Sequence, residues 1–264
     1  MAFARINGVL LHYRLAGPAG APVVAFVNSL GTDLRIWDDV IAELQSTCRV
    51  LTYDKRGHGL SDSPVGDYAL NDHVADLAGL LDHLEIGAAS VCGVSIGGLI
   101  AQAFALAAPT RADALVLCDT AARFGDAAMW EARAAAIRVG GMAAIADGIM
   151  ERWFSPDFFH RRPDDLAGWR NQFLRTDVAG YVSTCATLRD ADLSVEVGRL
   201  GCPVQVVAGA EDRSTPVEVV RALADVIPGA RFEVIAGAGH IPSIEQPAIL
   251  ARLVTRFLEE ARNG

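Results

Sequence analysis

Ser95 has the surroundings of a catalytic nucleophile in this sequence. It stands in the stretch Gly93-Val94-Ser95-Ile96-Gly97-Gly98, with a short apolar run before it and an Ala-rich run at helical spacing after it. A strand, a very tight turn and a helix would hold the serine at the apex, in strained φ/ψ, beside a helix N-terminus that stabilises negative charge. The glycines leave space where the strand and the helix nearly touch. The alternative is an ordinary turn, because glycine and serine often occur together in turns.

Asp212 and His240 are the residues that we expect to serve this nucleophile. Asp212 follows the apolar run 204–208, and His240 follows the run 231–235. If these runs are parallel strands, both residues lie at the same sheet edge as Ser95. His240 would then take the proton of Ser95, and Asp212 would hold the imidazole in the right tautomer and stabilise its charged form. Taken singly, Asp212 could instead cap a helix, and His240 could be a hydrogen-bonded loop histidine.

The other histidines of the chain fit this role less well. None of them follows a late strand: they are His12 in an early strand, His73 and His83 on one expected helix, His160 in a central helical segment, and His58. His58 stands in a tight loop, and we interpret it as a structural residue of a packed turn.

An oxyanion formed at Ser95 would need two backbone N–H donors. The first is expected from Ile96, directly after the nucleophile, and the second from the loop that follows the run 23–27. We predict Leu30 for the second donor from its position just past the turn. A backbone donor leaves no side-chain signature, so Leu30 could also be an ordinary apolar loop residue.

Predicted strands and helices alternate along the chain, and this order places Ser95, Asp212 and His240 after strands of one sheet. Continuous apolar runs predict buried strands, and runs at helical spacing predict helices between them. This rhythm predicts an α/β fold with a mostly parallel, doubly wound sheet. The expected strands are 9–15, 23–27, 48–54, the run that leads into Gly93, 114–119, 204–208 and 231–235; the expected helices are 37–44, 71–84 with an Asn/Asp cap, the run from Ile96 to about Pro109, and about 247–261.

The rhythm is interrupted between residue 121 and residue 190. This segment lacks a buried-strand run, is rich in alanine and arginine, and predicts several helices. We therefore interpret it as a helical cap inserted into a core formed by 1–120 and 191–264. Trp130, Arg133 and Trp153 are its candidates for contact with a substrate. Arginines on such helices are usually solvated and tryptophans usually lie in the core.

Length and composition fit one globular domain with an insertion. The chain has 264 residues, 52% of them hydrophobic and 21% charged. No apolar run reaches the roughly 20 residues of a membrane span, and the first residues have no signal-peptide pattern. Five scattered cysteines predict free thiols and a cytoplasmic location. The net charge of −9 argues against nonspecific nucleic-acid binding but permits a small anionic substrate.

Five short stretches together resemble the α/β-hydrolase superfamily along nearly the whole chain. They are Asn28-Ser29-Leu30-Gly31-Thr32, the loop 54–61 with Arg56-Gly57-His58-Gly59, the Ser95 turn, Gly209-Ala210-Glu211-Asp212, and Gly239-His240-Ile241-Pro242. Many members carry His-Gly where this chain has Asn28-Ser29. The 28–32 loop, taken with Gly93-Val94-Ser95-Ile96-Gly97-Gly98, is similar to the 3-oxoadipate enol-lactonase family.

That resemblance implies hydrolysis of an enol-lactone in the bacterial catabolism of aromatic acids such as protocatechuate. It implies attack by Ser95 on the lactone carbonyl and requires no metal or organic cofactor. The substrate is a small molecule that carries a carboxylate, for which Arg133 is the predicted cation. Neither a nucleic acid nor a membrane is an expected partner.

Other functions use the same residues. A carboxylesterase, a C–C bond hydrolase or a cofactor-free perhydrolase would need the same three side chains, and a non-catalytic small-molecule receptor could keep them on the same fold. A serine at position 95 argues against haloalkane dehalogenases and epoxide hydrolases, which carry aspartate there. A dinucleotide enzyme is disfavoured because the glycines around Ser95 lack G-x-G-x-x-G spacing.

Overall fold

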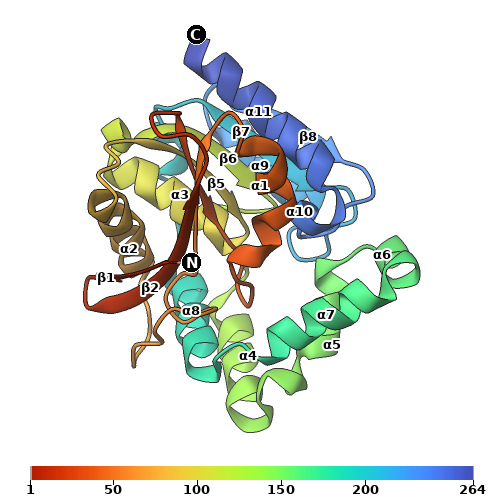
Figure 1. The fold of residues 1–264 in the computed structure, drawn as a ribbon. Helices are drawn as coiled ribbons and strands as arrows, with labels where there is room; N and C mark the ends of the chain where they lie inside the picture. Colours follow the sequence, from red (N-terminus) through yellow and green to blue (C-terminus); the bar gives the residue numbers. More distant parts are fainter. Residues whose placement is uncertain (1, 264) are drawn as a thin grey trace.

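The computed structural model describes residues 2–263 and contains one eight-stranded sheet (Figure 1). The sheet order is β1-β2-β4-β3-β5-β6-β7-β8. β1 and β2 pair antiparallel, as do β2 and β4, and the pairs from β4 through β8 are parallel. The strands are β1 Ala2–Ile6, β2 Val9–Ala16, β3 Val23–Val27, β4 Arg49–Tyr53, β5 Ala89–Val94, β6 Ala112–Cys118, β7 Val204–Gly209 and β8 Arg231–Ile235.

Helices cover both faces of this sheet and bury it. Figure 1 shows α2 and α3 on one face and α1 and α11 on the other, and the contacts α2–α3 and α1–α11 agree with this view. The core strands read as apolar runs because both of their faces are covered. The core helices are α1 Asp38–Leu44, α2 Leu70–His83, α3 Ile96–Ala107, α9 Val217–Val226, α10 Pro242–Glu245 and α11 Pro247–Asn263, and a 3₁₀ turn, η1 Leu34–Trp37, precedes α1.

The α/β fold class predicted from the sequence is confirmed. The expected strands and helices are present with ends within two residues of the predicted ones. Three of the core strands and α-helices were not predicted, the edge strand β1 and the helices α9 and α10. The capping of α2 also differs: the helix begins one residue earlier, after Ala69, and Asp72 accepts a hydrogen bond from the Ala69 N–H at 2.9 Å.

Five α-helices lie between β6 and β7 in the chain and form a separate layer beside the carboxyl ends of the strands (Figure 1). They are α4 Ala127–Gly140, α5 Ala146–Trp153, α6 Pro156–Arg161, α7 Pro163–Leu174 and α8 Val178–Asp190. The two ends of this segment meet, because Arg123 and Asp192 form an antiparallel bridge and Leu193 N–H bonds to Ala122 O at 2.9 Å. The predicted cap, residues 121–190, begins and ends close to this meeting point. Its bounds as a separate domain stay a prediction.

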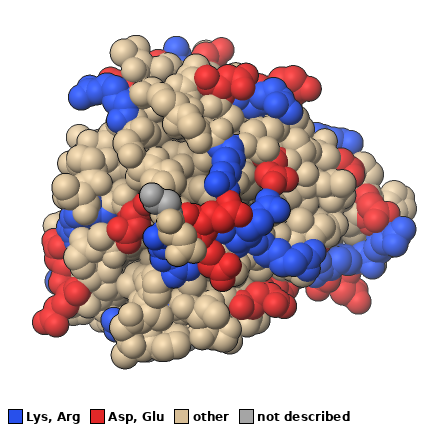
Figure 2. All heavy atoms as spheres, turned by 90° about the horizontal axis from the view of Figure 1, so that it is seen from above, with Lys and Arg blue, Asp and Glu red and all other residues tan. Residues whose placement is uncertain are grey.

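Acidic and basic side chains are interspersed on the surface. Figure 2 shows both signs side by side on one face, without a broad area of one charge. Surface pairs such as Arg256 with Glu233, at 2.6 Å, follow this pattern. Within residues 2–263, no helix is both long and apolar enough to cross a lipid bilayer.

Candidate active site

Ser95 occupies the turn between β5 and α3 in a strained conformation. Its φ of 59° and ψ of −125° fall outside the regions that L-residues favour, which costs about 1–3 kcal/mol. The end of β6 holds this turn on both sides. Ser95 N–H donates to Cys118 O at 3.0 Å, and Thr120 Oγ1 donates to Ser95 O at 2.6 Å. The tight turn that the sequence predicts is therefore present and anchored.

Glycines around Ser95 are required by close backbone contacts. A Cβ on Gly93 would lie 2.2 Å from Gly97 O, and a Cβ on Gly97 would lie 2.1 Å from Val27 O. Real Cβ atoms do not approach oxygens this closely, so any larger residue would push β5, α3 or β3 apart. Because these glycines have no side chain, the start of α3 can lie directly against the ends of β5 and β3.

Asp212 and His240 meet at the same sheet edge. His240 Nδ1 lies 2.8 Å from Asp212 Oδ2, and both side chains are buried. The Asp212 carboxylate also accepts hydrogen bonds from Ser214 N–H at 2.6 Å and from Thr215 Oγ1 at 2.6 Å. Burial by itself raises the pKa of Asp212, but His240 and these donors outweigh it and hold the pKa below its ordinary value. An ionised Asp212 fixes the proton of His240 on Nδ1 and leaves Nε2 as the base.

A second carboxyl group, Asp119, lies beside this pair. It follows β6, is fully buried, and accepts a hydrogen bond from Gly209 N–H at 2.6 Å. Its other oxygen has no hydrogen-bond partner among the described residues. Two causes raise the pKa of Asp119 well above its ordinary value: burial is the larger, and the charge of Asp212 is the second. The two carboxyl groups thus have opposite shifts, and we expect Asp119 to hold a proton when Asp212 is ionised.

Asp119→Asn is expected to stabilise the protein at neutral pH. A folded-state pKa above the unfolded one favours the native state at low pH, and this advantage is lost as the pH rises toward the folded pKa. Over that interval the stability gap between the variant and the wild type should widen by about 1.4 kcal/mol per pH unit. Urea unfolding at pH 4, 6 and 8 measures the gap. A gap that stays constant with pH would contradict a protonated Asp119.

The loop after β3 is held rigidly near the serine. Gly31 N–H donates to His58 Nε2 at 2.9 Å, and Lys55 Nζ donates to Ser29 O at 2.6 Å. Within residues 2–263 the N–H groups of Leu30 and Ile96 have no protein acceptor. Both are therefore free to bind an oxyanion, in keeping with the role predicted for them.

His58 must be neutral to hold this loop. Its Nε2 accepts from Gly31, which places the ring proton on Nδ1, 3.2 Å from Arg56 O. Two causes lower the pKa of His58 well below its ordinary value: burial is the larger, and the charge of Lys55 is the second. The structural role inferred from the sequence gains a specific partner here, the backbone of the 28–32 loop.

His58→Ala is expected to lower kcat by about 10–100-fold with a smaller change in KM, because Gly31 loses its acceptor and the neighbouring Leu30 donor loses its fixed position. Steady-state kinetics with His160→Ala as the matched control measures this. His160 is exposed on α6, so its replacement should leave kcat and KM unchanged. Equal kinetics for the two variants would contradict a positioning role for His58.

A cavity of about 140 Å³ joins the serine to the helical segment. Ser95, His240 and Leu30 line it from the core. All three residues predicted from the helical segment, Trp130, Arg133 and Trp153, line it from the other side. The sequence reasoning missed Ser29, Phe124, Gly125, Met129, Ile149, Arg152, Tyr181, Leu188 and Ser214.

The guanidinium of Arg133 lies 4.7 Å from the ring centroid of Trp130, which is a cation–π contact. Trp130 is in turn fixed by a 2.7 Å hydrogen bond from its Nε1 to Phe124 O. Arg152 brings a second guanidinium to the cavity. Two cations in a wall that also carries apolar side chains suit an anionic group on a small ligand.

Glu245 ties the His240 loop to the helical segment. Its carboxylate accepts from Gly239 N–H at 2.6 Å and from Ser155 Oγ at 2.6 Å. His240 N–H also donates to Trp153 O at 2.8 Å. The turn between α5 and α6 is therefore joined to the histidine loop by hydrogen bonds, and Trp153 and His240 line the same cavity.

Comparison with known proteins identifies the class of this fold. Residues 22–247 match the family described as the alpha/beta hydrolase fold. The chain therefore belongs to the α/β-hydrolase fold family, as its sequence motifs predicted.

Within that family, the chain is similar to 3-oxoadipate enol-lactonases. It is 39% identical to 3-oxoadipate enol-lactonase 2 of Acinetobacter baylyi, over 90% of this chain and 89% of that protein. It is 40% identical to the enol-lactonase from Burkholderia xenovorans LB400, whose crystal structure matches with a TM-score of 0.95 over 98% of this chain and 100% of that one. A thermophilic esterase from Thermogutta terrifontis is 29% identical, with a TM-score of 0.94 and 99% coverage of both chains. The resemblance drawn from the sequence motifs is thereby confirmed.

Proposed function

We propose that this protein is a serine hydrolase that opens the ring of 3-oxoadipate enol-lactone to give 3-oxoadipate, in the catabolism of aromatic acids through protocatechuate and β-ketoadipate. The likeness to enol-lactonases over nearly the whole chain, at 39% and 40% identity, carries the proposal. The site supports it, because Ser95 and His240 line one cavity with two arginines. Two relatives, at 39% and 34% identity, are named 3-oxoadipate enol-lactonases, and opening a lactone is the hydrolysis of an ester bond.

Ser95, His240 and Asp212 divide the work of acyl transfer. His240 Nε2 takes the Ser95 proton as Oγ attacks the lactone carbonyl carbon, and the N–H groups of Leu30 and Ile96 bind the oxyanion. The bond from the acyl carbon to the ring oxygen then breaks. The ring oxygen leaves as an enolate, a stable leaving group that needs little help from His240. Asp212 stabilises the imidazolium throughout.

Water completes the reaction at the acyl-enzyme. Ring opening leaves the former leaving group attached to the acyl chain, so it stays in the site until the ester to Ser95 is cleaved. The imidazolium of His240 first gives the proton from Ser95 to the enolate, which becomes the ketone of the product, and the imidazole is neutral again. His240 then takes a proton from water, the hydroxide attacks the acyl carbon, and this proton passes to Ser95 Oγ as the ester bond breaks. The step consumes one lactone and one water.

Arg133 is proposed to bind the carboxylate of the lactone. Arg133→Gln should raise KM for the enol-lactone about 10–100-fold with a small change in kcat, because charge pairing in a partly buried site contributes about 1.5–3 kcal/mol. Steady-state kinetics measures this, with Arg138→Gln as the control. Arg138 is an exposed arginine on the same helix, α4. Equal KM values for the two variants would remove Arg133 from carboxylate binding.

The lactonase activity itself is tested with purified protein and 3-oxoadipate enol-lactone. Loss of the ultraviolet absorbance of the enol-lactone should follow addition of the wild-type protein. No turnover would refute the proposal and favour a receptor on the same fold. Faster turnover of simple esters than of the lactone would favour a carboxylesterase.

A cytoplasmic location is also proposed. It rests on cysteine chemistry, because all five cysteines are free and four of them are buried. Labelling the denatured protein from whole cells with a thiol reagent should give five modified cysteines. Recovery of disulfide-linked chains would contradict this location.

A further inference from the structure

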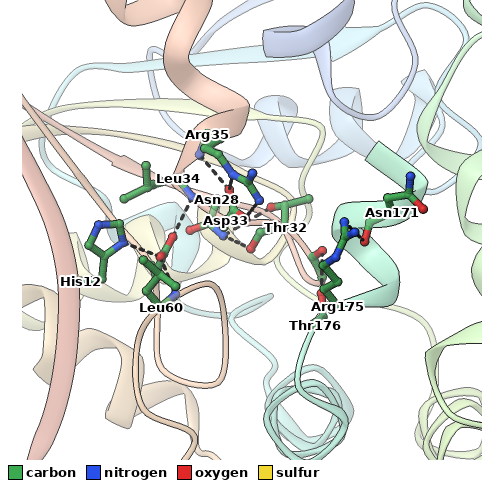
Figure 3. A network of polar contacts seen from close by, with 12 residues as sticks. His12, Asn28, Thr32, Asp33, Leu34, Arg35, Leu60, Asn171, Arg175 and Thr176 are labelled. Carbon is green, nitrogen blue, oxygen red and sulfur yellow. Dashed lines mark hydrogen bonds and ion pairs between the residues drawn. The ribbon is translucent and has the colours of Figure 1, made fainter. Parts of the chain in front are cut away.

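A second cavity, of about 380 Å³, lies between the core and the end of α7 and shares no lining residue with the Ser95 cavity. Its volume is in the range of small-molecule sites, about 300–1,000 Å³. Figure 3 shows its two sides, with Leu34, Arg35 and Leu60 on the core and Arg175 and Thr176 at the end of α7. Gln172, one turn earlier on α7, completes the second side.

The carboxylates in the wall of this cavity are already paired. Asp33 accepts from Arg35 Nε at 2.9 Å and from Arg35 Nη2 at 2.6 Å. Asp54 accepts from His12 Nδ1 at 2.7 Å and from Leu34 N–H at 2.8 Å. The wall therefore offers little unpaired negative charge to a ligand.

The charged group of Arg175, in contrast to these carboxylates, is largely without partners in the described chain. The one hydrogen bond of its guanidinium among the described residues goes to the carbonyl of Asn171, at 3.3 Å, and within residues 2–263 no carboxylate lies within 4.0 Å of this group. The guanidinium has five N–H donors in a planar fork that matches a carboxylate. It is thus a cation at the cavity with its charge and most of its donors unused.

Apolar and polar groups flank Arg175 in the cavity. Leu60 is a large hydrophobic residue that is 55% exposed. Gln172 is only 9% exposed, and its Oε1 is buried without a hydrogen-bond partner in the described chain. An atom buried to this degree is not open to a ligand in the cavity, so Gln172 contributes to the wall by its contact surface rather than by this oxygen.

We propose that this cavity is a second binding site, for a small organic monocarboxylate, with its carboxylate on Arg175 and its apolar body against Leu60. The site is separate from lactone hydrolysis, but it adjoins the loop that positions Leu30. Thr176 Oγ1, in the cavity wall, donates to Gly31 O at 3.3 Å. Bound ligand would therefore contact the support of the oxyanion loop.

Calorimetric titration with benzoate tests the site. Protein carrying both Arg133→Gln and Arg152→Gln is used, so that neither cation of the Ser95 cavity is present. One benzoate should bind per chain, and adding Arg175→Gln should weaken this binding at least tenfold, while Arg175→Lys should retain part of it. Because Arg175 is exposed, its replacement should leave the thermal unfolding curve unchanged.

Two controls separate the parts of the proposal. Inorganic phosphate supplies an anion without an apolar body, and cyclohexylmethanol supplies an apolar body without charge; both should bind at least tenfold more weakly than benzoate. Benzoate binding that is equal with and without Arg175, or phosphate binding as tight as benzoate binding, would overturn the proposal. No lactone is used, so the result is independent of the proposed hydrolase activity.

Discussion

Ser95→Ala is expected to lower kcat for the enol-lactone by about 10⁶-fold, to a rate near that left by the oxyanion donors and binding alone. The loss is large because the alanine has no oxygen to form the acyl bond. The fold should survive, since the backbone bonds of residue 95 to Cys118 and the hydroxyl of Thr120 do not use its side chain. KM should change little.

Rapid-quench and steady-state assays at high enzyme concentration would measure this loss. Ser29→Ala is the matched control, because Ser29 lines the same cavity while its carbonyl, rather than its hydroxyl, holds Lys55. Residual activity of Ser95→Ala within tenfold of the wild type would show that another residue performs the attack.

Asp212→Asn is expected to lower kcat by about 10⁴-fold at neutral pH. The asparagine keeps the shape but places an N–H₂ or a neutral oxygen against His240 Nδ1, 2.8 Å away in the wild type. The imidazole then loses the partner that fixes its tautomer and stabilises its charged form. The hydrogen bonds from Ser214 and Thr215 favour the ionised carboxylate, so they are lost or weakened in the variant.

The pH profile separates this role from a structural one. Because the pKa of Asp212 is lowered, the wild type should keep Asp212 ionised as the pH falls through the ordinary range of an aspartate, and its acid limb should report another group. Asp119→Asn should leave kcat within about tenfold of the wild type. If Asp212→Asn and Asp119→Asn had equal effects, the assignment of the acid to Asp212 would be wrong.

The core of the fold could be predicted because its strands carry their own signal. Val23–Val27 and Val204–Gly209 are buried on both faces and read as continuous apolar runs. The edge strand β1 lacks this signal, since it is short and Phe3 and Arg5 are not buried. Its pairing with β2 is a tertiary event that local sequence does not specify.

The order of Ser95, Asp212 and His240 could also be predicted, because each follows a strand at the same sheet edge. Asp119 could not. Its approach to Asp212 depends on β6 and β7 being neighbours in the sheet, and the helical segment separates them in the chain. Arg152 is similar, because the face that α5 turns toward the cavity is set by packing against α7 rather than by its own sequence.

The central claim, ring opening by Ser95, is tested most directly by mass spectrometry of the enzyme quenched during turnover. Because lactone opening expels no atoms, the acyl-enzyme should be heavier than the free enzyme by the mass of the whole lactone, and the added mass should map to the peptide that contains Ser95. Turnover without any adduct, or an adduct on another residue, would contradict the account.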